Sequence, residues 1–177
     1  MRWMWIDRIV ELVPRQKMVA IKNVSLAEEH LHDHFAADAK RGLAALPIMP
    51  ASLILEGTAQ TAGILVGHAE EFREKVILAK INRAEIHREA TPGTTLRYTA
   101  TIERMDGAGA STKCVIELFD FAAAAGFVEI GQVEMMFSHL DQNMGGAGKT
   151  GEAFPEHNFV FGDGFKTLLR TSGIAVP

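Results

Sequence analysis

Residues 47–67, PIMPASLILEGTAQTAGILVG, decide the fold of this chain. Pro50 suits the first turn of a helix, where a missing N–H costs nothing, and Gly67 suits its end. Apolar side chains fall on nearly every side of the predicted helix, which is typical of a helix buried in a core. Glu56 and Gln60 are four residues apart and therefore lie on one face. Because a buried carboxylate is costly unless it is paired or has a chemical task, Glu56 is the first candidate functional residue.

The length and composition limit what can surround this helix. With 177 residues, 47% of them hydrophobic and 23% charged, the chain is expected to form a globular domain with a substantial core. A formal net charge of −4 and the lack of a basic run argue against nucleic-acid binding. The single cysteine, Cys114, excludes a disulfide within the chain and indicates a reducing compartment, the cytoplasm. Glu56 and Gln60 in the apolar stretch argue against a membrane span, and the N-terminus lacks the layout of a secretion signal.

The segments on either side of the helix are predicted to be antiparallel strands. Residues 5–12 and 17–24 are rich in Val and Ile, and Pro14 and Arg15 mark a turn between them. Four further strands are predicted after the helix, at residues 76–87, 94–104, 113–121 and 127–140. We therefore expect an α+β fold in which a curved antiparallel sheet wraps around a long central helix.

The end of the chain differs in composition from the rest. Residues 141–177 begin with a glycine-rich stretch, which predicts a flexible link. Several phenylalanines follow, so this extension is expected to pack on the domain formed by residues 1–140 or on a neighbouring subunit.

A short motif upstream of the helix adds a second candidate. His34 and Phe35 follow Asp33, and the helix then opens with Met49 and Pro50. The order DHF…PIMPASLILEGTAQTAGIL resembles the hotdog-fold 3-hydroxyacyl acyl-carrier-protein dehydratases. Their signature is a His-Phe pair, then Met-Pro-Gly at the start of the central helix, then Glu or Asp followed by Ala-x-Ala-Gln. The flanking segments match too, so the resemblance runs in order from residue 3 to about residue 140.

The resemblance implies dehydration of a 3-hydroxyacyl thioester to the trans-2-enoyl thioester, in fatty-acid or related lipid or polyketide synthesis. By resemblance, His34 is the base, Glu56 is the acid or water-orienting group, and the N–H of Ala51 receives the thioester oxygen. A histidine near neutral pKa suits proton removal, and a carboxylic acid that burial keeps protonated suits the leaving group. The helix dipole would assist the oxyanion.

The same resemblance assigns the substrate tunnel and the partners. Phe35, Met49 and Leu53 are expected to line an apolar acyl tunnel, and Gln60 is expected to support the site. The partners are an acyl-carrier-protein or coenzyme A thioester and a second copy of the chain, because the family places its histidine and carboxylate on different subunits. A larger ring of dimers is an alternative. No cofactor, metal, nucleic acid or membrane span is expected.

The sequence departs from the family pattern at several places around the motif. Asp33 replaces the usual Gly before the histidine, Ala36 replaces the usual Pro, and Ala51 replaces the Gly of Met-Pro-Gly. Alanine at 51 keeps the backbone N–H, which is the group that the chemistry needs. The loop 36–48 is longer than the family norm and lies beside His34.

A further departure concerns the carrier. The family's FKR segment reads EIH at residues 85–87, which weakens a basic docking face for an acidic carrier protein. Arg83 and Arg88 remain as candidate docking residues.

Three other interpretations stay open from the residues alone. A hotdog thioesterase would use the helix carboxylate to position water and needs no partner histidine. A non-catalytic acyl-binding or assembly subunit is also compatible, because fold does not determine function. His30, His32 and His34 alternate in a way that could bind Zn²⁺, although convincing distant ligands are lacking.

Overall fold

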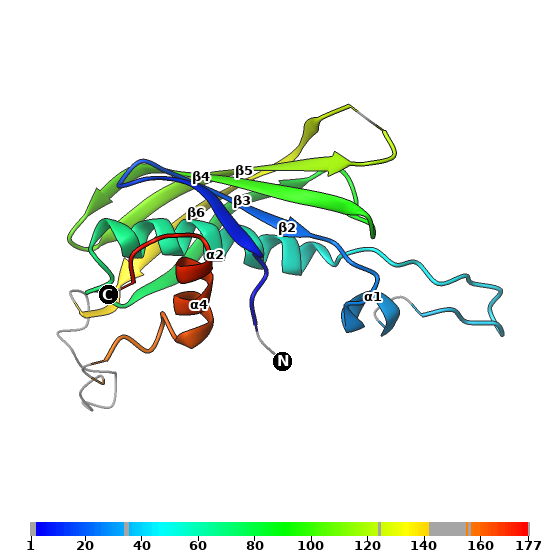
Figure 1. The fold of residues 1–177 in the computed structure, drawn as a ribbon, viewed down its shortest axis with the longest axis horizontal. Helices are drawn as coiled ribbons and strands as arrows, with labels where there is room; N and C mark the ends of the chain where they lie inside the picture. Colours follow the sequence, from blue (N-terminus) through cyan, green and yellow to red (C-terminus); the bar gives the residue numbers. More distant parts are fainter. Residues whose placement is uncertain (1–2, 34–35, 124, 142–154, 156, 177) are drawn as a thin grey trace.

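The computed structural model describes residues 3–33, 36–123, 125–141, 155 and 157–176, and Figure 1 shows their arrangement. His34 and Phe35 lie outside the described residues. The strands are β1 (Arg8–Val13), β2 (Lys17–Asn23), β3 (Val76–Ile86), β4 (Thr94–Asp106), β5 (Gly109–Asp120) and β6 (Phe127–His139). The helices are α1 (Glu29–Asp33), α2 (Ala51–Ala69) and α4 (Asp163–Thr171).

The strands form one antiparallel sheet that packs on α2, as predicted (Figure 1). Their order is β1-β2-β4-β5-β6-β3, so β1 and β3 are the edges. The alternation in β4 explains the packing, because its inward residues Leu96, Tyr98 and Ala100 are fully buried. Cys114 on β5 pairs with Ala100 and is buried on the same face.

α2 lies across this sheet as the centre of the core. Tyr98 contacts the helix so closely that a Cβ at Gly57 would lie 2.7 Å from its ring atoms. Pro50 is the N-cap, one residue before the first turn in which the sequence predicts it, and the helix continues past Gly67 to Ala69. The prediction that Gly67 ends the helix is therefore wrong. Gly67 instead makes room for Phe161, whose Cζ would lie 2.5 Å from a Cβ at that position.

Two strand boundaries differ from the sequence prediction by more than two residues. The first strand begins at Arg8 rather than at Trp5, because the backbone of Trp3 and Trp5 bonds to the side chain of Gln60. β5 begins at Gly109, four residues early, because its tight hairpin with β4 extends the pairing to Asp106 and Gly109.

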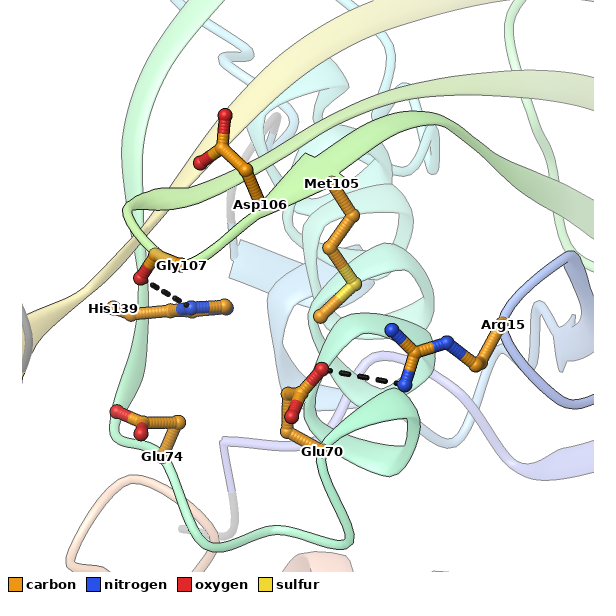
Figure 2. A pocket seen from close by; sticks show the side chains of 7 residues that line it. All are labelled: Arg15, Glu70, Glu74, Met105, Asp106, Gly107 and His139. Atoms are coloured by element: carbon orange, nitrogen blue, oxygen red, sulfur yellow. Dashed lines mark hydrogen bonds and ion pairs between the residues drawn. The ribbon is translucent and has the colours of Figure 1, made fainter.

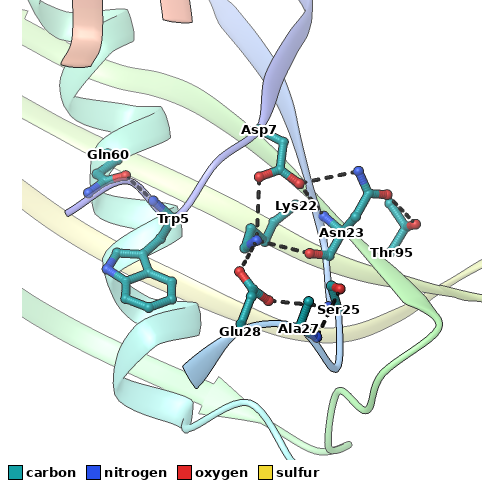
Figure 3. Close-up of polar contacts among 9 residues, drawn as sticks. All are labelled: Trp5, Asp7, Lys22, Asn23, Ser25, Ala27, Glu28, Gln60 and Thr95. Atoms are coloured by element: carbon teal, nitrogen blue, oxygen red, sulfur yellow. Dashed lines mark hydrogen bonds and ion pairs between the residues drawn. The ribbon is translucent and has the colours of Figure 1, made fainter. Parts of the chain in front are cut away.

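The connection after β2 contains the short helix α1. A buried lysine, Lys22, holds its start (Figure 3). Lys22 Nζ lies 2.6 Å from Glu28 and 3.4 Å from Asp7, and Glu28 also accepts the N–H of Ser25 at 3.2 Å. Leu31 of α1 is buried in the core.

The C-terminal segment, residues 157–176, returns to α2. Asn158 donates its amide N–H groups to the carbonyls of Phe72 and Glu74, both at 2.9 Å. Phe161 is buried against Phe72, with ring centroids 4.9 Å apart. α4 then lies below α2 (Figure 1), and Ser172 Oγ accepts the N–H of Ile9 at 3.0 Å. The segment is thus fixed to the body at both ends.

The membrane prediction concerned the apolar stretch of α2. None of the helices among the described residues combines the length and the apolar character that crossing a bilayer requires.

Candidate active site

Glu56 and Gln60 lie on one face of α2, as their spacing predicts. Gln60 Nε2 donates to Glu56 Oε1 at 3.0 Å and to the carbonyl of Trp3 at 2.9 Å. Gln60 Oε1 accepts the N–H of Trp5 at 2.8 Å (Figure 3). Both donors of the amide are used, so its orientation is fixed and one oxygen of Glu56 is held in place. Among the described residues, hydrogen bonding to the Glu56 carboxylate involves only Oε1.

A small apolar pocket begins at Glu56. Its volume is about 150 Å³, and Glu56, Gln60 and Gly63 form its helix wall. Leu78 and Phe137, from β3 and β6, form the sheet wall. A half-buried carboxylate beside apolar walls fits a role in proton transfer or in positioning a hydroxyl.

The C-terminal segment forms the remaining wall of the same pocket. Val160, Phe161 and Phe165 line it together with the helix and the sheet. No local pattern in the sequence connects these three residues with Glu56. The only signal was a cluster of phenylalanines after a glycine-rich stretch, which indicates packing but no location.

The start of α2 provides backbone donors rather than side chains. Pro50 is the N-cap and no side chain bonds to the first turn, while the N–H groups of Leu53 and Ile54 bond to Pro50 O. The N–H groups of Ala51 and Ser52 belong to the positions that an α-helix leaves without intrahelical acceptors. They sit at the positive end of the helix dipole, where an oxyanion is stabilised.

A second apolar pocket, of about 350 Å³, surrounds this helix start. Met49, Ala51 and Ile54 line it together with Ile86 and His87. Met49 is buried, and Leu53, the other predicted tunnel residue, is half-buried against the core. The structure thus places Met49 and Ala51 in one pocket.

Within one chain, Ala51 and Glu56 do not share a pocket. The two pockets have no lining residue in common. Five residues along a helix correspond to a rotation of about 140° and a rise of about 7.5 Å, so the two groups point to different sides of α2. Within one chain, Ala51 and Glu56 therefore belong to separate pockets.

His34 and Phe35 are not among the described residues, but the helix before them is. In α1, His30 packs edge-on against Trp5, with ring centroids 5.0 Å apart. Lys22 and Glu28 tie the start of α1 to β2. Helix α1, which precedes His34 in the sequence, therefore packs on Trp5, whose backbone N–H also bonds to Gln60.

The two arginines considered for carrier docking each contact a carboxylate. Arg83 bonds to Glu85 through two nitrogens, at 3.0 and 2.8 Å, and these contacts raise the pKa of Arg83. Arg88 lies 3.4 Å from Asp120. Both are surface ion pairs, which are weak and leave the guanidinium groups accessible to a competing anion.

Figure 2 shows a further pocket, of about 250 Å³, at the C-terminal end of α2. Arg15 donates to Ala69 O at 2.8 Å and lies 3.4 Å from Glu70. The Nδ1 of His139 lies 3.2 Å from Gly107 O, and since a carbonyl only accepts, this nitrogen carries the hydrogen. Glu70 is fourteen residues from Glu56, or roughly 20 Å along the helix, so this pocket is separate from the Glu56 site.

The alternative zinc interpretation rested on His30, His32 and His34. Within the described part of the chain, no group of three or more His, Cys, Asp or Glu residues is placed to hold a metal ion. His34 is outside that part, so the alternating histidines are not tested as a set.

Comparison with known proteins identifies the family. The model of the FabA-like domain matches residues 2–129. The chain belongs to the FabA-like family. Its relatives include a 3-hydroxyacyl-[acyl-carrier-protein] dehydratase FabZ of Clostridium kluyveri, which is 32% identical over 139 residues, 78% of this chain and 86% of that protein. The FabZ of Listeria monocytogenes serotype 4b is 36% identical over 109 residues, 61% of this chain and 70% of that protein.

Solved structures agree with this FabA-like chain in fold. The dehydratase heterocomplex ApeI:P from Xenorhabdus doucetiae has a TM-score of 0.58 at 14% identity, covering 84% of this chain and 86% of that one. A thioesterase family protein from Silicibacter pomeroyi has a TM-score of 0.56 at 11% identity, covering 74% and 82%. The predicted hotdog fold is confirmed, and the fold accommodates both dehydratases and thioesterases.

Proposed function

We propose that this FabA-like protein removes water from a 3-hydroxyacyl thioester and releases the trans-2-enoyl thioester. The observation that carries the proposal is the Glu56 carboxylate, held by Gln60 at 3.0 Å on the wall of an apolar pocket. A family with FabZ dehydratase relatives gives that carboxylate its chemical context. Because those relatives are named for acyl-carrier-protein substrates, we propose the same carrier here.

The proposed reaction uses three groups of the chain. His34 takes the proton from C2, and the electron pair moves toward the thioester carbonyl. The N–H of Ala51 receives the charge that gathers on the carbonyl oxygen, as a helix start can. The C3–O bond then breaks, Glu56 gives a proton to the leaving hydroxyl, and C2 and C3 become doubly bonded. Return of the proton from His34 to Glu56 completes the cycle with one water released.

The proposed site is shared between two copies of the chain. Glu56 and Ala51 face different pockets within one chain, so a second copy is needed to bring both to one substrate. β3 is an edge strand, and its stretch from Leu78 to Ala84 is exposed. An exposed edge with apolar side chains such as Leu78 and Ile81 is suited to pairing with another strand. We propose that β3 pairs with β3 of a second copy.

The assay separates dehydration from its rival. Purified protein is incubated with a 3-hydroxyacyl thioester on acyl-carrier protein or coenzyme A, and enoyl formation and free thiol are followed together. Enoyl product without thiol supports the proposal. Thiol release alone indicates a thioesterase, and neither product indicates a binding or assembly role.

Two variants test the assigned roles. His34→Ala and Glu56→Gln should each lower enoyl formation by about 10²- to 10⁴-fold, the usual contribution of a general acid or base. Circular dichroism checks that both variants fold. Near-normal turnover in either variant contradicts the role of that residue.

Mixing the two inactive variants tests the shared site. If each site takes His34 from one copy and Glu56 from the other, random re-pairing leaves about a quarter of all sites intact. Activity should then return to that fraction of the original. No recovery despite exchange of subunits contradicts the shared site but not dehydration itself.

A further inference from the structure

We infer that the C-terminal segment, through Val160 and Phe165, closes the far end of the acyl pocket and limits the chain length of the substrate. The inference rests on the proposed function, since it assigns the apolar pocket at Glu56 to the acyl chain. It adds a determinant of specificity that lies outside the matched family domain, residues 2–129.

The C-terminal segment forms a wall of the pocket with the side chains of Val160, Phe161 and Phe165. The pocket begins at the carboxylate of Glu56 and continues past Gly63, which is about 10 Å further along α2. The ring of Phe161 meets Gly67 and so lies at this end of the pocket, and Val160 and Phe165 line the pocket beside Phe161. Their side chains are apolar, so the end of the pocket suits a hydrocarbon and provides no polar group for another kind of ligand.

The wall is attached to the body on both sides. On one side of it, Asn158 bonds to the carbonyls of Phe72 and Glu74. On the other side, Leu168 and Leu169 are buried, and Ser172 bonds to the N–H of Ile9. Attachment at both ends prevents the segment from swinging away when a longer chain enters.

The wall also fits closely against the helix. Phe161 packs against Gly67 so closely that a Cβ there would lie 2.5 Å from its ring. Phe165 packs edge-on against Phe161, with ring centroids 5.7 Å apart. Phe161 is buried and structural, whereas Phe165 is half-buried and lines the pocket at its margin. Phe165 can therefore be shortened with less damage to the core.

The volume sets the length that fits. At about 30 Å³ for each non-hydrogen atom, the share that a water takes in the liquid, 150 Å³ holds about five atoms. With C3 of the substrate at Glu56, five more carbons give an acyl chain of about eight. Each buried methylene strengthens binding by about fourfold until the wall is reached.

The test measures binding without turnover. S-alkyl pantetheine thioethers, whose alkyl chains carry no hydroxyl and therefore cannot be dehydrated, are titrated by calorimetry with alkyl chains of about four to fourteen carbons. In the unchanged protein, affinity should rise to about eight carbons and then level off or fall. Phe165→Ala should raise the affinity for twelve carbons relative to eight by at least about tenfold, because removing the ring extends an apolar cavity.

Two further variants control for general disturbance. Phe159→Ala removes an exposed ring of the same segment that does not line this pocket, and it should leave the length profile unchanged. Val160→Phe fills the pocket end and should shift the preference to shorter chains. Each variant is checked for folding by thermal denaturation.

The outcomes distinguish this inference from the proposed function. If Phe165→Ala and Val160→Phe both leave the dependence of affinity on chain length unchanged, Val160 and Phe165 do not limit the chain length. This conclusion holds whether or not the protein forms enoyl product. Absence of binding by every thioether overturns the acyl pocket as well. Dehydration itself fails only if the separate enoyl assay is negative.

Discussion

The two ends of α2 differ in how their backbone polar groups are hydrogen-bonded. At the N-terminal end, no side chain caps the helix, and the first backbone N–H groups face a pocket lined by Ala51. At the C-terminal end, the carbonyl of Gly67 accepts the N–H groups of Glu70 and Phe72, and the carbonyl of Ala69 accepts Arg15. The N–H groups at the first end have no side-chain cap, whereas the carbonyl groups at the other end accept hydrogen bonds that stabilise the helix.

A buried lysine near each end repeats this difference. Lys22, which precedes α1, contacts two carboxylates, those of Glu28 and Asp7. Lys75, which follows α2, contacts the carboxylate of Asp141, with its Nζ 2.9 and 3.2 Å from the two oxygens. Among the described residues, no second carboxylate contacts Lys75. A buried ammonium group is tolerated only with such partners, so the number of partners should decide how each region responds to mutation.

The largest effect is expected from Asp141→Asn. It leaves the buried ammonium group of Lys75 without its carboxylate and should lower the free energy of unfolding by about 3–5 kcal/mol. Glu28→Gln is the matched change at the other lysine, and it should cost less than about 2 kcal/mol because Asp7 still faces Lys22. Urea denaturation of both variants measures the two values. Equal losses would contradict the partner-number argument.

A smaller effect is expected from Gly67→Ala at the closed end of the helix. Alanine favours a helix over glycine by about 1 kcal/mol, but its Cβ would meet the ring of Phe161. The overpacking should prevail and give a net loss of about 1–3 kcal/mol in the free energy of unfolding. Gly63→Ala is the control, since a Cβ there lies 3.3 Å from Phe137 and needs less adjustment. Greater stability of the Gly67 variant than of the Gly63 variant would refute the close contact.

The smallest effect concerns alkaline pH and the sheet side of the core. Burial raises the pKa of the Cys114 thiol above its ordinary value, and burial likewise raises the pKa of Tyr98. Above a pH of about 8.5 the unfolded chain loses the thiol proton and the folded chain keeps it, so stability must fall as pH rises. The free energy of unfolding at pH 9.5 should be about 1 kcal/mol lower than at pH 8.5 because of this thiol.

Cys114→Ala should remove this difference, whatever constant loss the shortened side chain adds. Titration of Tyr98 contributes at higher pH, above the ordinary pKa of a tyrosine at about 10. An unchanged slope in the alanine variant would mean that another group causes the alkaline loss.

The central helix and its polar pair could be predicted because their signals are local. Pro50, the apolar run and the four-residue spacing of Glu56 and Gln60 act within a few turns. The other partners of Gln60 are 55 and 57 residues away in sequence, at Trp5 and Trp3, and no local pattern indicates them. The residues assigned to catalysis by resemblance remain predictions for the assay.

The helix end and the pocket wall could not be predicted, because both depend on contacts between residues that are distant along the chain. Gly67 is a residue type that often ends a helix, but here the lack of a side chain leaves space for the ring of Phe161. The pocket wall likewise depends on where the C-terminal segment docks, which its phenylalanines alone do not specify. Tertiary packing decides such positions, and a single sequence carries little information about it.

The burial of Cys114 has a practical consequence. It is the sole thiol of the chain and lies on the sheet face that contacts α2. A thiol reagent therefore reaches it only after the sheet and the helix separate, so the labelling rate of the unmodified protein reports how often that separation occurs. Cys114 is thus a built-in probe of core opening. Ligands that bind to α2 should slow the labelling of its thiol.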